Sequence, residues 1–278
     1  VADPNYIKKL LSLSEVGTPF LDNALDWAND ELPKGVLSEG ASSVLMKALY
    51  LARTARPDLQ KAICSLASCV SAWSTAHDQS LKRLMSYLYH TRDHTMKQTV
   101  GPGKVLDCSL DLHTDSDFGS CLKTRKSTSG VWMEVKGDDG TSFVLTWLSQ
   151  RQGCVSNSTP EAELVAANTG LYKVMVPALD LCQSLFGGPF AKRRLLEDNT
   201  VAEADLKSGR SKSLGHLSRT HDVSLKSIAQ TIKREGIDVD RAESAEMKAD
   251  LLTKPFTSTA AWQKSIGHLN IRDWRKVP

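Results

Sequence analysis

The stretch SLDLHTDSDFGS, residues 109–120, carries the strongest fold signal in the second half of the chain. An apolar run meets a Gly/Ser turn here, which predicts a β-strand over 109–115. Two carboxylates, Asp115 and Asp117, stand at this junction. Aspartate is common in turns because its side chain accepts hydrogen bonds from nearby backbone amides. Taken alone, this stretch favours turn residues over metal ligands for both.

The segments that follow predict an α/β domain. Further strands are predicted from β-branched and aromatic residues over 130–136, 142–149, 193–198 and 237–241. Helices are predicted from helical spacing over 158–186, with a kink or break at Pro177, from about 200, over 220–235 and over 245–254, where Pro255 ends the last one. This order predicts a mixed five-stranded sheet flanked by helices.

The first part of the chain is helical in pattern. A short amphipathic segment is predicted over 6–13, and longer helices are predicted from Ser42, around 63–73 and around 81–88. The sequence Gly-Pro-Gly at 101–103 is the clearest break between the two patterns. We therefore expect a small all-helical segment over 1–100 and an α/β domain over 104–278.

Composition narrows the class of protein. The 278 residues carry a net charge of +3, which permits a nucleic-acid partner without requiring one. The six cysteines form no CxxC pair and do not cluster with histidines, which argues against a zinc site and favours reduced thiols. No apolar stretch is long enough to span a bilayer, and the first residues resemble neither a signal nor a transit peptide. An intracellular protein, cytoplasmic or nuclear and not secreted, is predicted.

Four acidic residues each lie at the edge of an apolar element. They are Asp115, Glu163, Asp198 and Asp250. Asp115 and Asp198 end predicted strands, so both face one crevice if those strands are parallel neighbours. Glu163 lies beside the inward stripe of its helix, whereas Glu161 is placed to form a capping box with Ser158. Each could simply bond to nearby backbone or to Lys or Arg. Four together predict an oxygen-only site for Mg²⁺, with Mn²⁺ as a substitute.

At these residues the sequence resembles the C-terminal part of Ty1/copia-type LTR retrotransposon polyproteins. The blocks that carry the resemblance are HTDSDFGS…RKSTSG, TWLSQRQGCVSNSTPEAELVA, EDNT, RTHDVSLKSIAQTIKREG and AEMKADLLTKPF. Upstream, ALYLARTARPDLQKAICSLA resembles the tail of the reverse transcriptase and its connection. The resemblance implies a ribonuclease H-like fold over 104–278 after a reverse-transcriptase tail.

The resemblance also implies a function for the four acids. Asp115, Glu163, Asp198 and Asp250 match the family's catalytic, metal-binding carboxylates, with Asp115 bridging two Mg²⁺ ions and Asp117 only a neighbour. The implied reaction is endonucleolytic hydrolysis of the RNA strand of an RNA–DNA hybrid, leaving a 3′-hydroxyl and a 5′-phosphate. The missing reverse-transcriptase palm and fingers could be a further partner.

Basic and polar residues near the acids could contact the hybrid backbone, although such residues are often plain solvated surface. The candidates are Lys123, Arg125, Lys126, Thr159, Arg210, Lys212 and Arg219. Two departures from the family keep an alternative open. The paired aspartates of the polymerase are absent, and the loop before Asp250 has no histidine. The alternative is a catalytically degenerate remnant that binds nucleic acid or protein. A third hypothesis is a nuclease of the same fold that acts on another substrate, such as DNA.

Overall fold

The computed structural model describes residues 14–21, 27, 29, 31–101, 103, 105–121 and 123–276. The chain divides into two compact units, here called unit 1 (Val1–Lys97 with Lys254–Pro278) and unit 2 (Gln98–Thr253). This division differs from the expected domains, because Lys254–Pro278 packs with the first unit. The amphipathic segment expected at 6–13 lies outside the described residues.

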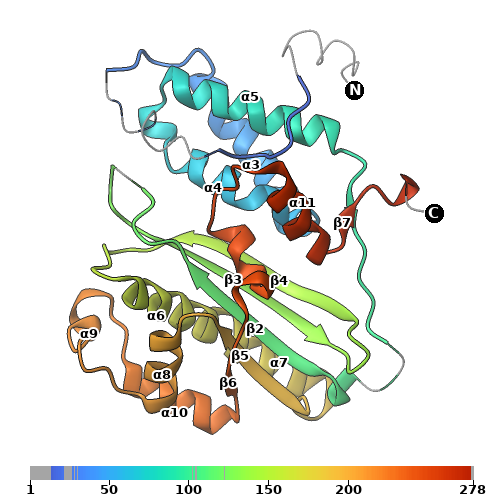
Figure 1. Ribbon diagram of the computed structural model, residues 1–278, viewed down its shortest axis with the longest axis vertical. Coiled ribbons are helices and arrows are strands. Elements are labelled where there is room, and N and C mark those ends of the chain that lie inside the picture. The colour runs from blue at the N-terminus through green and yellow to red at the C-terminus, as the bar shows by residue number, and fades with distance from the viewer. Residues whose placement is uncertain are drawn as a thin grey trace. The chain divides into compact units, whose positions relative to one another are not determined.

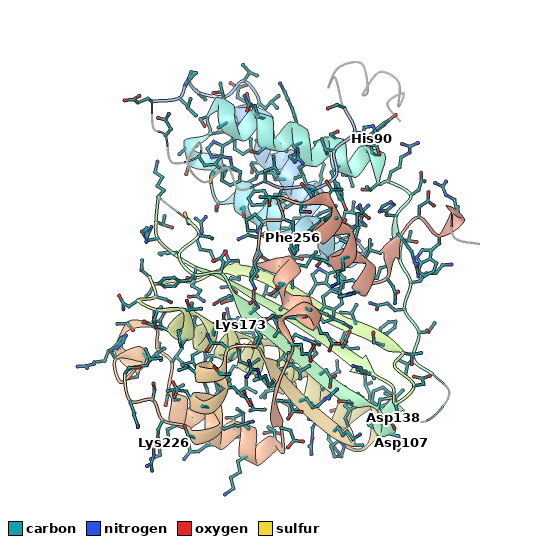
Figure 2. All side chains as sticks on the ribbon, in the orientation of Figure 1. His90, Asp107, Asp138, Lys173, Lys226 and Phe256 are labelled. Atoms are coloured by element: carbon teal, nitrogen blue, oxygen red, sulfur yellow. The ribbon has the colours of Figure 1, made fainter. Side chains whose placement is uncertain are left out.

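Unit 2 is built on one five-stranded sheet with the strand order β4-β3-β2-β5-β6 (Figure 1). Its strands are β2 (Ser109–Ser116), β3 (Thr128–Lys136), β4 (Ser142–Arg151), β5 (Lys192–Glu197) and β6 (Asp238–Arg241). β2, β3 and β4 are antiparallel, whereas β5 is parallel to β2 and β6 is parallel to β5. The mixed five-stranded sheet predicted from the sequence is confirmed. Asp107 and Asp138 mark the end of the sheet at which β2 begins and β3 ends (Figure 2).

Helices cover one face of this sheet. They are α6 (Thr159–Gly170), the π-helical turn η4 (Leu171–Met175), α7 (Val176–Phe186), α8 (Thr200–Ser208), α9 (Leu217–Thr220) and α10 (Leu225–Glu235). The core between sheet and helices contains Leu110 and Leu112 of β2, Val131 of β3, and Leu164 and Leu171, all fully buried. Burying these apolar side chains is the main driving force for this layer.

Glycine at position 170 lets α6 lie close against β2. A Cβ atom there would lie 2.7 Å from Cγ2 of Thr114 and 3.3 Å from Cδ2 of Leu112. The first contact is too short for a real Cβ atom and the second is tight, so a residue larger than glycine would push the helix away from the strand. The close approach keeps α6, which carries Glu163, beside the carboxyl end of β2.

The ends of several helices differ from the sequence-based expectations. The long helix changes to a π-helical turn at Leu171–Met175, just before Pro177, and continues as α7. The helix predicted over 220–235 starts later than expected. Asp222 has a left-handed φ of 56°, and Ser224 caps the N-terminus of α10. The segment expected as a helix over 245–254 instead forms the 3₁₀ turns η5 (Ser244–Glu246) and η6 (Lys248–Leu252).

Unit 1 is mainly helical, as predicted. Its elements are α3 (Ser38–Thr54), η1 (Pro57–Leu59), α4 (Gln60–Ala67), η2 (Val70–Ala72), α5 (Thr75–His90), α11 (Thr259–His268) and η7 (Trp274–Lys276). A two-stranded sheet of β1 (Thr95–Met96) and β7 (Ile271–Arg272), which the sequence did not indicate, joins the two segments of this unit.

A buried polar network holds α11 to the other helices of unit 1. Arg56 forms a two-bond ion pair with Asp58, at 2.9 and 2.7 Å. Tyr87 donates to Asp58 at 3.1 Å, and the indole N–H of Trp262 donates to the Tyr87 hydroxyl at 3.1 Å. The Arg-Pro-Asp motif at 56–58 therefore has a structural role, since a buried charge requires a partner of this kind.

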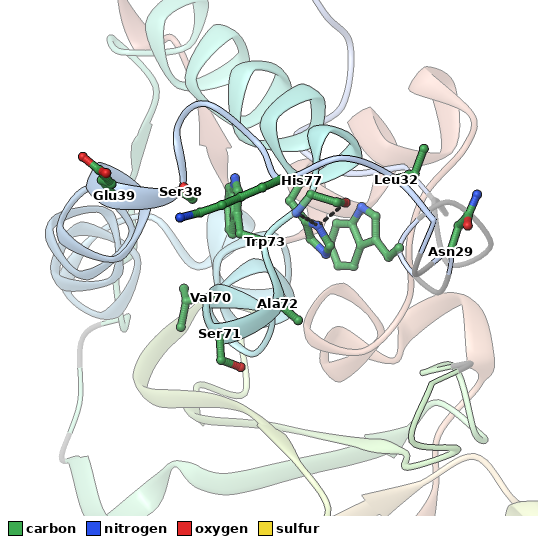
Figure 3. Close-up of a pocket in the computed structure, with 12 residues that line it drawn as sticks. Asn29, Leu32, Ser38, Glu39, Val70, Ser71, Ala72, Trp73 and His77 are labelled. Atoms are coloured by element: carbon green, nitrogen blue, oxygen red, sulfur yellow. Dashed lines mark hydrogen bonds between the residues drawn. The ribbon is translucent and has the colours of Figure 1, made fainter.

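Unit 1 also contains a pocket of about 480 Å³ (Figure 3). Its wall includes the imidazole of His77, whose centre lies 5.1 Å from the ring of Trp27 and 5.3 Å from that of Trp73. His77 Nδ1 accepts from the backbone N–H of Ser74, which orients the imidazole at the start of α5. Across the described residues of both units, no helix combines the length and the apolar character needed to cross a bilayer.

Candidate metal centre

The carboxyl ends of β2 and β5 meet at one edge of the sheet of unit 2. β2 and β5 are parallel neighbours, paired from Ser109 with Lys192 to His113 with Leu196. Asp115 lies near the end of β2 and is 1% exposed, and Asp198 directly follows β5. The parallel pairing that the sequence left conditional is therefore present, and it brings these two acids to the same edge.

Asp250 reaches this edge from the other face of the sheet, where the orange-red segment with η6 crosses the strands (Figure 1). Gly130 of β3 is paired with Asp115, and a Cβ at Gly130 would lie 2.6 Å from Thr253 Cγ2 and 2.8 Å from the carbonyl oxygen of Ala249. Two hydrogen bonds fasten the segment. Ser149 donates to the carbonyl of Leu252 at 2.6 Å, and Thr253 donates to Asp115.

The result is a cluster of carboxylates that could hold a cation. One oxygen each of Asp115, Asp198 and Asp250 lie within 4.8 Å of one another. A second group, Glu163, Glu197 and Asp198, meets the same distance condition. Asp198 belongs to both groups. The structure thus brings all four acids singled out in the sequence to one place, and adds a fifth.

Glu163 is held in the cluster by the start of α6. The side chain of Ser158 caps this helix by accepting from the backbone N–H of Glu161 at 3.4 Å. Glu163 lies one turn further along and is only 3% exposed. Its Oε2 is buried and has no hydrogen-bond partner among the described residues. A buried carboxylate oxygen without a donor is costly, which fits a position intended for a cation.

The electrostatics of the cluster favour uptake of positive charge. Burial raises the pKa of Glu163 well above its usual range, and the charges of Glu197, Asp115 and Asp198 raise it further. Burial also raises the pKa of Glu197, with the charges of Asp198 and Asp115 adding to it. These carboxylates are destabilised as anions unless a proton or a metal ion compensates them. Oxygen donors of this kind, without His or Cys, suit Mg²⁺ or Mn²⁺.

Glu197 was missed in the sequence. The available signal was its place in "LLED", at the end of a strand whose preceding residues are apolar. An acid in such a buried strand is unusual, because strands buried on both faces are near-continuous apolar runs. The resemblance to the family points to the neighbouring Asp198 and gives no signal for Glu197.

Glu161 and Asp117 serve the local backbone. Glu161 accepts from the backbone N–H of Asn157 at 3.0 Å rather than from that of Ser158, so the predicted capping box is only half formed. Its other oxygen lies 2.9 Å from Nε2 of His221, whose side chain is buried. Asp117 accepts from the backbone N–H of Thr128 at 2.6 Å and from Ser120 at 2.7 Å, and lies in neither carboxylate group.

The candidate backbone-contacting residues occupy two loops and two helix ends. Lys123, Arg125 and Lys126 lie in the turn between β2 and β3, where Arg125 adopts a left-handed φ of 56°. Arg210 and Lys212 lie between α8 and α9, Arg219 lies in α9, and Thr159 begins α6. All are exposed except Lys126, which is half-buried.

Comparison with known proteins gives several relatives, although no family model matches the chain. It is 30% identical over 119 residues to the secreted RxLR effector protein 161 of Plasmopara viticola, covering 42% of this chain and 77% of that protein. It is 27% identical over 214 residues to the retrovirus-related Pol polyprotein from transposon TNT 1-94 of Nicotiana tabacum, covering 77% of this chain. It is 24% identical over 183 residues, 61% of this chain, to the putative transposon Ty5-1 protein YCL074W of Saccharomyces cerevisiae.

The chain spans only 15% of the tobacco polyprotein and 54% of the yeast protein. Among solved structures, RNase H1 of Halobacterium salinarum matches with a TM-score of 0.33 and 16% identity, over 52% of this chain and 94% of that chain. The RNase H domain of prototype foamy virus matches with a TM-score of 0.31 and 13% identity, over 58% and 91%.

The sequence relatives and the strand order of the sheet agree with each other. The tobacco and yeast proteins both carry transposon names, and the aligned region of the tobacco polyprotein covers most of this chain. The mixed sheet with β5 and β6 parallel to β2 is the arrangement expected of a ribonuclease H-like fold. The chain is therefore distantly homologous to the copia- and Ty5-type retrotransposon Pol polyproteins.

Proposed function

We propose that unit 2 is a metal-dependent endonuclease that hydrolyses the RNA strand of RNA–DNA hybrids. The proposal rests on the two clusters of three acidic residues described above. The clusters share Asp198 and lie where the parallel strands of the sheet end. Two Mg²⁺ ions bound there would activate a water molecule and stabilise the leaving oxygen of a phosphodiester. Asp115, Glu163, Asp198 and Asp250 would be the residues that hold them.

The protein contributes position and charge to this reaction. β2 and β5 fix Asp115 and Asp198 at one edge, and η6 delivers Asp250 to the same place. The hydroxyl of Thr253 orients Asp115 by donating to its carboxylate. Residues that are held in this way need little reorganisation when charge develops in the substrate, which is the main source of electrostatic catalysis.

Recognition of the hybrid would combine phosphate contacts with reading of the 2′-hydroxyls. The exposed basic residues of the β2–β3 turn and of the α8–α9 segment would contact the backbone, with a salt-dependent affinity. Contacts to 2′-hydroxyls in the shallow minor groove would distinguish RNA from DNA. The reverse-transcriptase palm and fingers are a proposed further partner. An intracellular location, cytoplasmic or nuclear, is part of this proposal.

One assay tests the proposed activity. The full chain is incubated with labelled RNA–DNA hybrid, RNA duplex or DNA duplex, with Mg²⁺ or with EDTA. We expect hybrid-specific cleavage that EDTA abolishes and that Asp115→Asn reduces by at least about 100-fold. The products should carry 3′-hydroxyl and 5′-phosphate ends. Cleavage that persists in EDTA or in Asp115→Asn would contradict the proposal, and cleavage of DNA duplex alone would indicate a different nuclease.

A binding role without cleavage is the second candidate. Among the residues from Ala242 to Lys248, just before Asp250, there is no histidine, and Phe118 beside the Asp pair is exposed. In that case the full chain would retain salt-dependent binding to the hybrid, measured by fluorescence anisotropy, while the labelled hybrid stays intact with Mg²⁺ and with Mn²⁺.

A further inference from the structure

Glu197 lies inside the carboxylate cluster and has no role in the mechanism described so far. It is the last residue of β5, is fully buried, and directly precedes Asp198. One of its oxygens lies within 4.8 Å of oxygens of Glu163 and Asp198. Three acidic side chains therefore converge on one small volume at the α6 side of the sheet.

The hydrogen bonds to Glu197 are too few and too long to compensate a buried charge. Its Oε1 accepts from the backbone N–H of Asn199 at 3.2 Å, and its Oε2 accepts from the hydroxyl of Thr114 at 3.3 Å. Strong hydrogen bonds to a carboxylate are normally 2.7–2.9 Å long and come from charged donors. Among the described residues, no Lys, Arg or His forms an ion pair with Glu163, Glu197 or Asp198.

A second observation points to a ligand at this place. Oε2 of Glu163 belongs to a side chain that is 97% buried, and no described residue donates a hydrogen bond to it. Glu163 is also in the group that Glu197 completes. Buried carboxylates that lie this close repel each other as anions, and Oε2 of Glu163 has no hydrogen-bond donor to offset the repulsion. Their close approach becomes favourable when a cation with oxygen preference lies between the carboxylates.

We propose that Glu197 is a fifth carboxylate of the metal centre, and that it holds a divalent cation together with Glu163 and Asp198. The other cation is held by Asp115, Asp198 and Asp250, so Asp198 is the residue shared by the two ions. This inference rests on the proposed function for the identity of the cation. It differs from the expectation drawn from the family, in which four acids suffice and Asp115 is the shared ligand.

The competing explanation is that Glu197 is only a hydrogen-bonded acid beneath the site. Glu197→Gln separates the two explanations because it keeps the shape and keeps an oxygen to accept from Asn199. It removes the negative charge that a metal ligand needs. A neutral, structural role predicts no change in metal binding for this variant, whereas a ligand role predicts a loss.

The test is calorimetric titration of the metal-free full chain with Mn²⁺, in the absence of nucleic acid. Wild type is compared with Glu197→Gln, Glu197→Asp and the control Glu203→Gln, which removes a charge on α8 that is paired with Lys207 outside the cluster. We expect Glu197→Gln to weaken one of two binding events by about tenfold or more and to spare the other. Glu197→Asp, which keeps the charge on a shorter stem, should fall between this variant and wild type. Glu203→Gln should match wild type.

Three outcomes overturn the inference: Mn²⁺ binding by Glu197→Gln that equals wild type, a wild type that takes up no cation, or equal losses in both binding events. Thermal unfolding in EDTA checks folding, and we expect Glu197→Gln to be at least as stable as wild type. If Glu197→Gln fails to fold, the comparison of Glu197→Asp with wild type decides. Selective loss of one binding event together with absent hybrid cleavage would contradict only the proposed function. Cleavage by a wild type whose Glu197→Gln variant binds Mn²⁺ normally would contradict only the role of Glu197.

Discussion

Lys248 donates from its ammonium group to both carboxylate oxygens of Glu134, each at 2.6 Å, and this pair joins η6 to the middle of β3. Glu134 also accepts from the indole N–H of Trp132 at 3.0 Å, and His113 Nε2 lies 3.7 Å from its other oxygen. Glu134 is 1% exposed, so its charge depends on these partners. Since Asp250 follows Lys248 by two residues, the pair also controls where Asp250 lies.

Replacing Lys248 by Met should lower the free energy of unfolding by about 3 kcal/mol, because it leaves the buried carboxylate of Glu134 without its cation. It should also raise the Mg²⁺ concentration needed for half-maximal hybrid cleavage about tenfold, because Asp250 loses its tether. Urea unfolding and a Mg²⁺ titration of cleavage measure the two effects. Lys47→Met, at an exposed position of α3, is the control. An unchanged Mg²⁺ requirement would show that η6 keeps its place without the pair.

The same pair makes stability depend on acid pH. Burial raises the pKa of Glu134, but His113 and Lys248 outweigh burial and lower that pKa from 4.5 to about 2. A carboxyl group with a depressed pKa stabilises the fold above its unfolded value and loses this contribution as pH falls toward the folded value. Wild type should therefore lose about 3 kcal/mol of unfolding free energy through this group between about pH 4.5 and pH 2. The difference in unfolding free energy between wild type and Glu134→Gln, measured with urea, should become smaller as the pH falls through that range. A constant difference would contradict the assignment.

The carboxylate cluster should give the opposite pH dependence when no metal is bound. Burial, followed by the charges of Glu197, Asp115 and Asp198, raises the pKa of Glu163. The folded protein then keeps a proton that the unfolded chain releases, so the unfolding free energy falls as pH rises above the ordinary glutamate value.

Divalent cations should reduce this loss of stability. In EDTA, the melting temperature should fall between about pH 6 and about pH 8.5, and with Mg²⁺ it should fall less, because the cation replaces the proton and binds more tightly at high pH. Differential scanning calorimetry at both pH values checks this. In EDTA, Glu163→Gln should have a smaller difference in melting temperature between the two pH values than wild type. Equal pH dependence with and without Mg²⁺ would count against cation binding at Glu163.

The sequence was informative about the sheet because its signals were local. The strands predicted over 109–115 and 193–198 each depend on neighbouring residues, and the structure has strands in both places. Their parallel pairing joins residues that are far apart in the chain. The sequence alone could therefore not establish that these two strands are neighbours. The helix boundary between Thr220 and Leu225 depended on a left-handed φ at Asp222, a backbone state that asparagine and aspartate adopt more often than most residues but that no pattern requires.

The residues around Asp250 show why part of the candidate site could not be derived. The segment Lys248–Leu252 has helical spacing, yet it forms a 3₁₀ turn that is fastened to the sheet through Glu134 and Ser149. Both partners lie about 100 or more positions away in the chain, and only the folded sheet brings them together. Glu197 was overlooked for a different reason, since nothing in a single sequence states which face of a strand end turns toward a helix.

Gly130 offers the sharpest test of how η6 lies on the sheet. A Cβ atom at this position would meet the side chain of Thr253 and the carbonyl oxygen of Ala249 at 2.6 and 2.8 Å. The threonine methyl group could rotate, but the backbone carbonyl can move only with the whole turn. Gly130→Ala should therefore displace η6, lower the unfolding free energy by about 1–3 kcal/mol and weaken Mn²⁺ binding.

A matched alanine substitution controls for the backbone effect of removing glycine. A Cβ at Gly40 in α3 would meet nothing within 4 Å, so Gly40→Ala should stabilise the protein by up to about 1 kcal/mol and leave Mn²⁺ binding unchanged. Calorimetric titration and urea unfolding of both variants measure the contrast. If Gly130→Ala bound Mn²⁺ as wild type does, Asp250 would not depend on the close contact between η6 and β3. The position of Asp250 would then have to come from the Lys248–Glu134 pair and from the hydrogen bonds of Ser149 and Thr253.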